Sequence, residues 1–326
     1  MIKYVFFGSD YSATNRLFND LKLRNDVMYI NAPIKNRIIR FAFKVHFSSK
    51  INKYIKLPFK KVWRYCLIKK LEISDDDKIY FIYCRNWINS IVQMEFVKFC
   101  NFKFKKSNHT LYFTDIHGAR EVDMEKLKMI FDNIYIFDKS EAKKLNIKHY
   151  PLPYSKLNIS QDIVIDKDVA FVGRAKSRYK QLIEIYDILT FYGLKCEFYI
   201  IDIPRSQQIK KNGLHYTDFI PYEDTLEIIR SARCGIELKI DDCESYSNRV
   251  YEAIVNNRLL LTNNSNVKIN KYYSEKYMQV FSDVKNINIE FFKINQSDIN
   301  YNYNNDYSPI NFLDEIVKVN REESLL

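Results

Sequence analysis

Residues 234–264 read CGIELKIDDCESYSNRVYEAIVNNRLLLTNN and predict a strand, a polar loop, a short helix and a second strand. Ser247 is a good N-cap, because its hydroxyl can accept a hydrogen bond from the first free backbone N–H groups of a helix that begins at Asn248. The asparagine pair 256–257 can end this helix in the left-handed conformation. The apolar run 258–262 then suits a buried parallel strand.

The same helix start carries groups suited to a phosphate. Helical spacing predicts one face with Val250, Ala253 and Ile254 and an opposite face with Arg249, Glu252 and Asn256. A cation and a carboxylate then project one turn apart beside a helix N-terminus, whose partial positive charge attracts anions. The candidate ligand-binding residues here are Ser247, Asn248, Arg249 and Glu252. The alternative is an ordinary β–loop–helix–β unit in which Glu252 is a solvated helix residue.

This segment resembles the C-terminal domain of GT-B nucleotide-sugar glycosyltransferases, particularly bacterial enzymes that build surface polysaccharide. Glu244 and Glu252 have seven residues between them, and Ala253 and a basic residue leading into a strand follow, as in many members of that group. The resemblance implies that Glu252 holds the donor's ribose and that Glu244 faces the donor sugar. A glycine usually lies between the two glutamates, whereas this loop reads SYSN at 245–248.

A second resemblance to the same transferases lies earlier in this half of the chain. A predicted strand at 168–172 runs into Gly173 and Arg174, and Lys180 follows after five more residues. In GT-B transferases the Arg and Lys of this pattern hold the donor diphosphate. Cations on the loop after a strand and at a helix start can neutralise two phosphates and the charge of the leaving group. The alternative is a solvated basic loop.

The 326-residue length accommodates two domains, each with its own core. The composition is 47% hydrophobic and 28% charged, no apolar run approaches the roughly 20 residues of a membrane span, and the N-terminus does not resemble a secretory signal. Six cysteines without C-x-x-C spacing favour a reducing cytoplasm.

The resemblance implies an α/β GT-B fold, with two Rossmann-like domains facing across a cleft. We expect an acceptor-binding domain at 1–152, a donor-binding domain at 153–305 and a helix at 306–326 that crosses back to the first domain.

Polar residues follow a predicted strand of the first domain. Asp115 and His117 come directly after the strand 110–114, at the sheet edge where parallel α/β proteins bind ligands. Either could act as the base of an inverting transferase or could orient the acceptor in a retaining one. The paired glutamates resemble a motif found most often in retaining families, which favours the second role; a polar turn without a catalytic part is the alternative. The D-x-D at 75–77 precedes a strand as a turn would, so we expect no metal there.

The net charge of +11 is unevenly placed. The segment 27–71 contains no Asp or Glu but has twelve cations: Lys35, Arg37, Arg40, Lys44, Lys50, Lys53, Lys56, Lys60, Lys61, Arg64, Lys69 and Lys70. Ile34, Ile38, Phe41 and Val45 recur among them at helical spacing. A basic, aromatic, amphipathic segment can lie on an anionic membrane surface. Two alternatives are a core-packing helix with a solvated basic face and a nucleic-acid site, although no nucleic-acid motif accompanies the charge.

The resemblance implies transfer of a sugar from a UDP- or GDP-type donor to a glycan or lipid-linked acceptor in surface polysaccharide synthesis, such as capsule, O-antigen or lipopolysaccharide. We expect a retaining, metal-independent reaction without a cofactor, because Arg174, Lys180 and a helix N-terminus can stabilise the departing diphosphate. The expected location is the cytoplasm, with peripheral attachment to the inner membrane face. The competing functions are a nucleotide-sugar epimerase of the same fold and a non-catalytic basic protein that binds membrane or nucleic acid.

Overall fold

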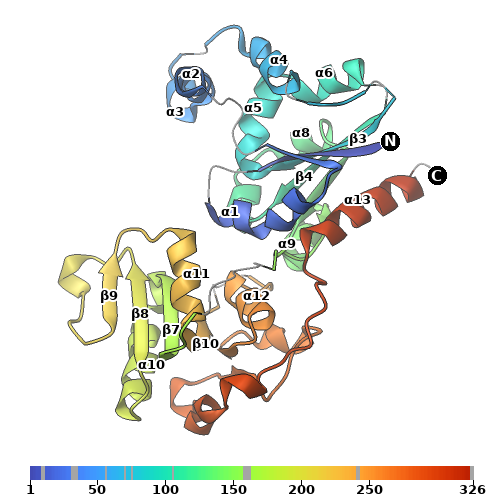
Figure 1. Cartoon of the computed structure of the whole chain (residues 1–326). Helices are drawn as coiled ribbons and strands as arrows, with labels where there is room; N and C mark the ends of the chain where they lie inside the picture. The colour runs from blue at the N-terminus through green and yellow to red at the C-terminus, as the bar shows by residue number, and fades with distance from the viewer. Residues whose placement is uncertain are drawn as a thin grey trace. The chain divides into compact units, whose positions relative to one another are not determined.

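The structure is a computed structural model that describes residues 1–8, 12–30, 36–55, 57–69, 71–74, 76–104, 106–156, 163–239 and 243–323. Ile34, Lys35, Lys56, Lys70 and Asp75, all considered above, lie outside these ranges. The chain forms two compact units (Figure 1). Unit 1 combines Met1–Ser155 with Tyr307–Leu326, and unit 2 is Lys156–Asp306.

Unit 1 contains a six-stranded sheet in which every neighbouring pair is parallel, in the order β2-β1-β3-β4-β5-β6. This is the flavodoxin-like strand order. The strands are β1 Ile2–Phe7, β2 Val27–Ile30, β3 Lys78–Cys84, β4 Ser107–Phe113, β5 Asn133–Ile136 and β6 Lys148–His149. The helices are α1 Ser12–Leu17, α2 Arg37–Phe47, α3 Ser49–Asn52, α4 Trp63–Ile68, α5 Ile88–Gln93, α6 Phe96–Lys103, α7 Ile116–Arg120, α8 Met124–Lys128, α9 Lys139–Leu145 and α13 Pro309–Glu323. Short 3-10 turns occur at Asn19–Leu23, Lys60–Val62 and Arg85–Trp87.

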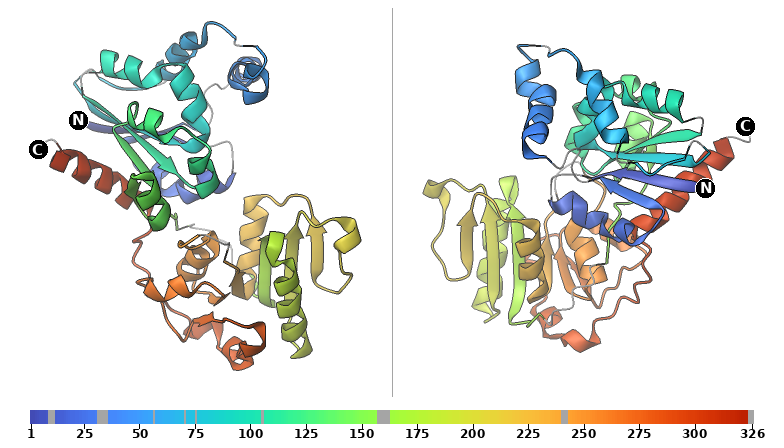
Figure 2. Two further views of the ribbon diagram at one scale, coloured as in Figure 1. Left: turned by 180° about the vertical axis from the view of Figure 1, so that it is seen from behind. Right: turned by 45° about the horizontal axis from the view of Figure 1, so that its top comes forward.

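Helices cover both faces of this sheet (Figure 2), so its strands read as nearly continuous apolar runs. On one face, Phe96 of α6 packs edge-on against Phe7 of β1, with ring centroids 5.7 Å apart. On the other face, Phe312 of α13 packs against Tyr112 of β4 at 5.0 Å. A hydrogen bond of 2.5 Å also joins the side chain of Asn320 to that of Asn108. These contacts make the C-terminal helix α13 part of the core of unit 1.

Unit 2 has a second six-stranded parallel sheet, in the order β12-β11-β10-β7-β8-β9. Counted within the unit, this is the order 3-2-1-4-5-6 of dinucleotide-binding Rossmann domains. The strands are β7 Lys167–Arg174, β8 Cys196–Ile201, β9 Leu214–Thr217, β10 Ala232–Glu237, β11 Leu259–Thr262 and β12 Met278–Val280. The helices are α10 Tyr179–Phe191, α11 Tyr222–Arg230 and α12 Asn248–Val255. The 3-10 segments are Lys176–Arg178, Arg205–Gln207, Ser265–Ile269, Val284–Asn286, Ile289–Lys293 and Gln296–Asp298.

The strand order places a topological switch point in each unit, where the connections leave in opposite directions; open parallel sheets bind ligands beyond the carboxyl ends of the strands at such a point. In unit 2 the switch point lies between β7 and β10, and in unit 1 it lies between β1 and β3. These two edges are therefore the places to look for ligand-binding side chains.

Candidate functional site

The helix predicted at 248 begins where expected. Ser247 has extended backbone angles, and its hydroxyl accepts a hydrogen bond of 3.3 Å from the backbone N–H of Arg249. The helix ends at Val255, and Asn257 beyond it has a positive φ of 50°. The N-cap and the left-handed residue after the helix are thus both confirmed.

Glu252 is buried, although helical spacing placed it opposite the apolar face, so the alternative in which it is a solvated helix residue is wrong. Its exposed fraction is 0%. The hydroxyl of Tyr222, at the start of α11, donates to one carboxylate oxygen at 2.8 Å, and a guanidinium nitrogen of Arg249 pairs with the other. This side of α12 is buried as well, because Tyr222 of α11 packs against it. Both carboxylate oxygens of Glu252 are therefore engaged by side chains.

Arg249 also links α12 to β7. Its second guanidinium nitrogen donates a hydrogen bond of 3.0 Å to the carbonyl of Val172, one residue before Gly173. Only 14% of the Arg249 side chain is exposed. This contact places the start of α12 beside the carboxyl end of β7, at the switch point of unit 2.

A further carboxylate at this edge escaped the sequence analysis. Glu237 is the last residue of β10 and is 2% exposed. Its carboxylate accepts 2.7 Å hydrogen bonds from the backbone N–H of Ser247 and from the hydroxyl of Thr262 on β11. Burial raises the pKa of the Glu237 carboxyl, and these hydrogen bonds act in the opposite direction. Glu237 therefore fixes the loop that leads into α12. The sequence feature that could have revealed it is an acidic residue at the end of an apolar strand.

The predicted diphosphate cations lie at the end of β7. Arg174 is exposed, and its Nε is 2.7 Å from a carboxylate oxygen of Asp202, the residue after β8. Lys180 is exposed in the first turn of α10. Gly173 is the penultimate residue of β7, and its φ of +159° is one that residues with a side chain rarely adopt, although a Cβ there would meet only the Phe171 ring at 3.6 Å. Backbone conformation therefore favours the glycine, and both cations are available to a ligand.

Arg178, which the sequence analysis did not single out, shapes this loop. Its guanidinium donates to the carbonyl of Arg174 at 2.6 Å and to the carbonyl of Leu238, the residue after β10. A third bond of 3.2 Å runs to the carbonyl of Ala175. The side chain thus ties the end of β7 to the end of β10, and it positions the backbone on which Arg174 is carried.

The remaining predicted donor residues lie in the loop before α12. Glu244 is exposed, and its carbonyl accepts a 2.8 Å hydrogen bond from the side chain of Asn266. Asn248 is half-buried at the first helical position. The edge between β7 and β10 thus carries backbone N–H groups, two exposed cations and buried carboxylates, a combination that can bind a diphosphate and hydrogen-bond hydroxyl groups.

The structure separates the two polar residues predicted in unit 1. Asp115 caps the short helix α7, with its carboxylate accepting a 2.5 Å hydrogen bond from the N–H of Gly118. His117 is highly exposed and pairs with Glu121 at 2.9 Å. The residues after this strand therefore form a helix of five residues and not a plain turn, and α8, Met124–Lys128, follows it.

Asp115 lines a pocket of about 690 Å³ at the carboxyl ends of β3 and β4. Its described lining includes Arg85, Asn86, Asn89, Thr114 and Lys126 but not His117. Arg85 pairs with Glu121 at 2.5 Å and lies across Gly118, where a Cβ would come within 2.1 Å of its Nε. This pocket at the carboxyl edge, whose lining combines these polar groups with apolar side chains, suits a hydroxyl-bearing ligand.

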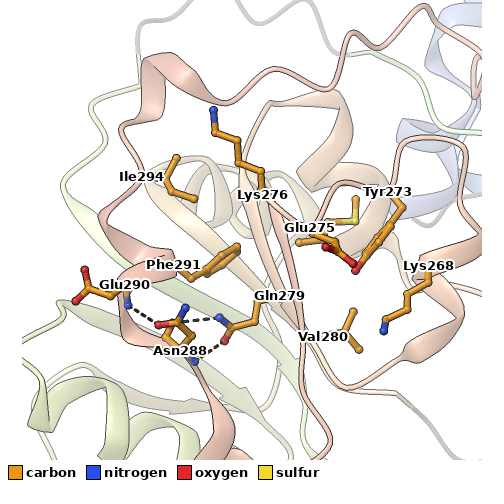
Figure 3. Close-up of a pocket in the computed structure, with 11 residues that line it drawn as sticks. Lys268, Tyr273, Glu275, Lys276, Gln279, Val280, Asn288, Glu290, Phe291 and Ile294 are labelled. Carbon is orange, nitrogen blue, oxygen red and sulfur yellow. Dashed lines mark hydrogen bonds between the residues drawn. The ribbon is translucent and has the colours of Figure 1, made fainter.

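A different pocket, of about 480 Å³, lies beside β12 (Figure 3). Gln279 of β12 and the backbone of Asn288 are joined there by two hydrogen bonds of 3.1 Å. Lys276 and Glu290 are also part of its lining. β12 is at the edge of the sheet, whereas the donor candidates lie at β7 and β10, so this pocket is not part of the candidate site.

The described residues lack the long apolar helix of a membrane span and the clustered ligands of a metal site. No helix among them has the length and apolar character needed to cross a bilayer. Within the same residues, no three His, Cys, Asp or Glu side chains are grouped so that they could hold a metal ion. Asp77 of the D-x-D accepts a 3.0 Å hydrogen bond from the backbone N–H of Ser74 and lies 3.2 Å from the N-terminal amine, as a turn residue would.

Comparisons with known proteins show the fold. No family model and no curated protein matches the sequence. The solved structure of the DNA-modifying enzyme β-glucosyltransferase, with and without uridine diphosphoglucose, is similar over 93% of this chain and 94% of that one, with 15% identity and a TM-score of 0.50. TarM matches with 12% identity and a TM-score of 0.49, over 78% of this chain, which spans 57% of TarM. The N-terminal domain of Candida albicans trehalose-6-phosphate phosphatase matches with 9% identity and a TM-score of 0.49, over 91% of this chain and 90% of that one.

Two six-stranded parallel sheets and the likeness to β-glucosyltransferase together confirm the predicted fold class, an α/β GT-B fold built from two Rossmann-like domains.

Proposed function

We propose that this protein is a glycosyltransferase that moves a sugar from a UDP- or GDP-type nucleotide sugar to a glycan or lipid-linked acceptor. One observation carries the proposal: Arg174, Lys180 and the start of α12 are gathered at the switch point of a sheet with Rossmann strand order. Such an edge binds nucleotides, and its cations suit a diphosphate that must leave with its charge.

In this proposal unit 2 binds the donor. Arg174 and Lys180 contact the diphosphate, while Gly173, Ser247 and Asn248 line the approach to it. By the resemblance of the paired glutamates, Glu252 holds the ribose and Glu244 faces the donor sugar. Because the Glu252 carboxylate is fully buried and engaged by Tyr222 and Arg249, one of these contacts must open for a ribose hydroxyl to reach it. Glu237 and Arg178 position the loops that carry these groups.

The acceptor binds to unit 1, in the pocket that Asp115 lines. Since the paired glutamates resemble those of retaining families, we propose retention of anomeric configuration without a required metal. The pathway is bacterial surface polysaccharide synthesis, including capsule and lipopolysaccharide. The protein would act in the cytoplasm, at the inner face of the membrane where a lipid-linked acceptor is exposed.

Donor binding is tested by thermal unfolding with UDP and GDP against uridine and guanosine. A ligand at about 100 times its Kd adds roughly 2.7 kcal/mol to the free energy of unfolding. For a unit of this size, that raises Tm by about 5–10 °C. We expect this rise with one diphosphate and much less with its nucleoside, because the cations contact the phosphates. No shift with either diphosphate would reject the proposal. A released epimerised sugar without transfer would instead indicate an epimerase.

The role of Asp115 is tested by Asp115→Asn, because asparagine is an equally good N-cap and keeps α7 intact while removing the charge. We expect turnover within about tenfold of the wild type and a product with the donor's anomeric configuration, as retention requires no protein base at this position. The product is read by NMR. An inverted product with a loss of about 10²–10⁴ in turnover would make Asp115 the base.

His117→Ala serves as the matched variant, since the His117 side chain is exposed and, within the described residues, pairs with Glu121. We expect normal turnover from it. A large loss of turnover in His117→Ala, with Asp115→Asn still active, would place His117 in the acceptor site.

A further inference from the structure

Helix α2 is amphipathic, but its apolar stripe faces away from the core. Phe43 and Phe47, four residues apart, pack inward at 8% and 9% exposure, and the Phe43 ring lies 5.4 Å from that of Trp63. Ile38 and Phe41 are 79% and 69% exposed. The helix therefore packs on the core, as that alternative expected, but through Phe43 and Phe47 and not through the stripe seen in the sequence.

The stripe belongs to a well-formed helix. The side chain of Asn36 caps it, accepting hydrogen bonds of 2.9 and 3.2 Å from the backbone N–H groups of Ile38 and Ile39. Ile38, Phe41 and Val45 follow the i, i+3, i+7 spacing that lines one helix face. On the outer stripe of this ordered helix Ile38 and Phe41 are exposed, whereas Val45 is half-buried.

The segment that follows α2 adds more exposed apolar side chains. Four large residues there are 58–82% exposed: Tyr54, Ile55, Phe59 and Val62. The segment is tied to α2, because the side chain of Asn52 donates to the carbonyl of His46 at 2.8 Å and the Trp63 indole donates to the His46 ring at 2.6 Å. Figure 1 shows α2 and α3 at the periphery of unit 1, away from its sheet.

Charge accompanies these side chains. No acidic residue occurs between positions 27 and 71. Arg37, Lys50 and Lys53 are exposed around the apolar residues. Lys61 is paired with Glu95 at 2.7 Å, and Lys60 is bonded to Gln93, so these two are less available to a partner.

We propose that this surface, comprising Ile38, Phe41, Tyr54, Ile55, Phe59 and Val62 with the exposed cations, docks unit 1 on an anionic lipid bilayer. Exposed aliphatic and aromatic side chains can enter the boundary between headgroups and acyl chains, while each cation near the surface adds on the order of 1 kcal/mol. Nucleic acid would use the cations but offers little to exposed Ile and Val. The inference deepens the proposed function and rests on it, because the lipid-linked acceptor of that proposal lies at the membrane.

Flotation with phosphatidylcholine vesicles, with and without phosphatidylglycerol, tests the docking on the full chain. We expect binding to the anionic vesicles that weakens with salt. Ile38→Ser combined with Phe41→Ser should weaken it about tenfold or more, because apolar burial in the bilayer is lost. Reversal of Arg37, Lys50 and Lys53 to Glu should weaken it further and remove the preference for anionic lipid. Phe191→Ser is the control, since Phe191 is 83% exposed at the end of α10 in unit 2.

The nucleotide-induced rise in Tm should be the same in all these variants, so a failure of docking is separable from a failure of the proposed donor site. Wild-type protein that does not float with anionic vesicles would overturn the inference. So would unchanged flotation of the Ile38 and Phe41 variant. Tight binding of a DNA duplex, with no vesicle binding, would assign the surface to nucleic acid instead.

Discussion

Glu252→Gln should lower the free energy of unfolding of unit 2 by about 3–5 kcal/mol, because it removes one partner of a buried ion pair. The Glu252 carboxylate is fully buried and accepts from Tyr222 and Arg249. A glutamine offers one acceptor oxygen, so it cannot accept from both Tyr222 and Arg249, and it carries no charge to pair with the guanidinium. Urea unfolding followed by intrinsic fluorescence measures the loss. Donor affinity should fall in the same variant.

A second substitution separates stability from binding. Arg249→Met in the Glu252→Gln background removes the charge that the first change leaves unpaired, so most of the lost stability should return. Glu227→Gln is the matched control, since Glu227 is exposed on α11 and its charge should contribute within about 0.5 kcal/mol. A Glu252→Gln protein as stable as the wild type would contradict the buried pair. Full affinity for nucleoside diphosphate in the single variant would leave Glu252 with a structural role only.

The burial of Glu252 also shows where sequence reasoning ends. Local rules predicted the N-cap at Ser247, the helix that starts at Asn248 and the following strand, because each depends on residues close in sequence. Helical periodicity placed Glu252 opposite the apolar face, and the actual burial comes from Tyr222, thirty residues earlier. Helical periodicity in a sequence reveals the one apolar face of a helix. It does not reveal a second buried face that another element covers.

Glu237 and Asp115 illustrate two other limits. An acid that ends a strand looks exposed in the sequence, and Glu237 is buried because Ser247 and Thr262, on two later elements, supply its hydrogen bonds. The helix that Asp115 caps has only five residues, too few to show a period. Strands, by contrast, were recognisable as apolar runs in both units, although their order in the sheets was not, since it depends on long-range pairing.

Arg174→Ala and Lys180→Ala should each lower kcat/KM for sugar transfer by about ten- to 150-fold. A charge-assisted contact to the diphosphate contributes about 1.5–3 kcal/mol, and this charge grows as the diphosphate leaves. Stability should change by no more than about 1 kcal/mol, because both side chains are exposed and the pair of Arg174 with Asp202 is a surface ion pair. Initial rates at subsaturating donor give kcat/KM, and thermal unfolding gives the stability.

Lys195→Ala controls for the general effect of removing a cation from unit 2. Lys195 is exposed just before β8, at the amino edge of the same sheet, whereas Arg174 and Lys180 lie at the carboxyl edge. Long-range attraction of the donor would be reduced similarly by all three changes, but a direct phosphate contact is lost only in two of them. We therefore expect Lys195→Ala to keep wild-type kcat/KM. Equal losses in all three variants would reduce the role of Arg174 and Lys180 to general attraction, and full activity in both would place the diphosphate elsewhere.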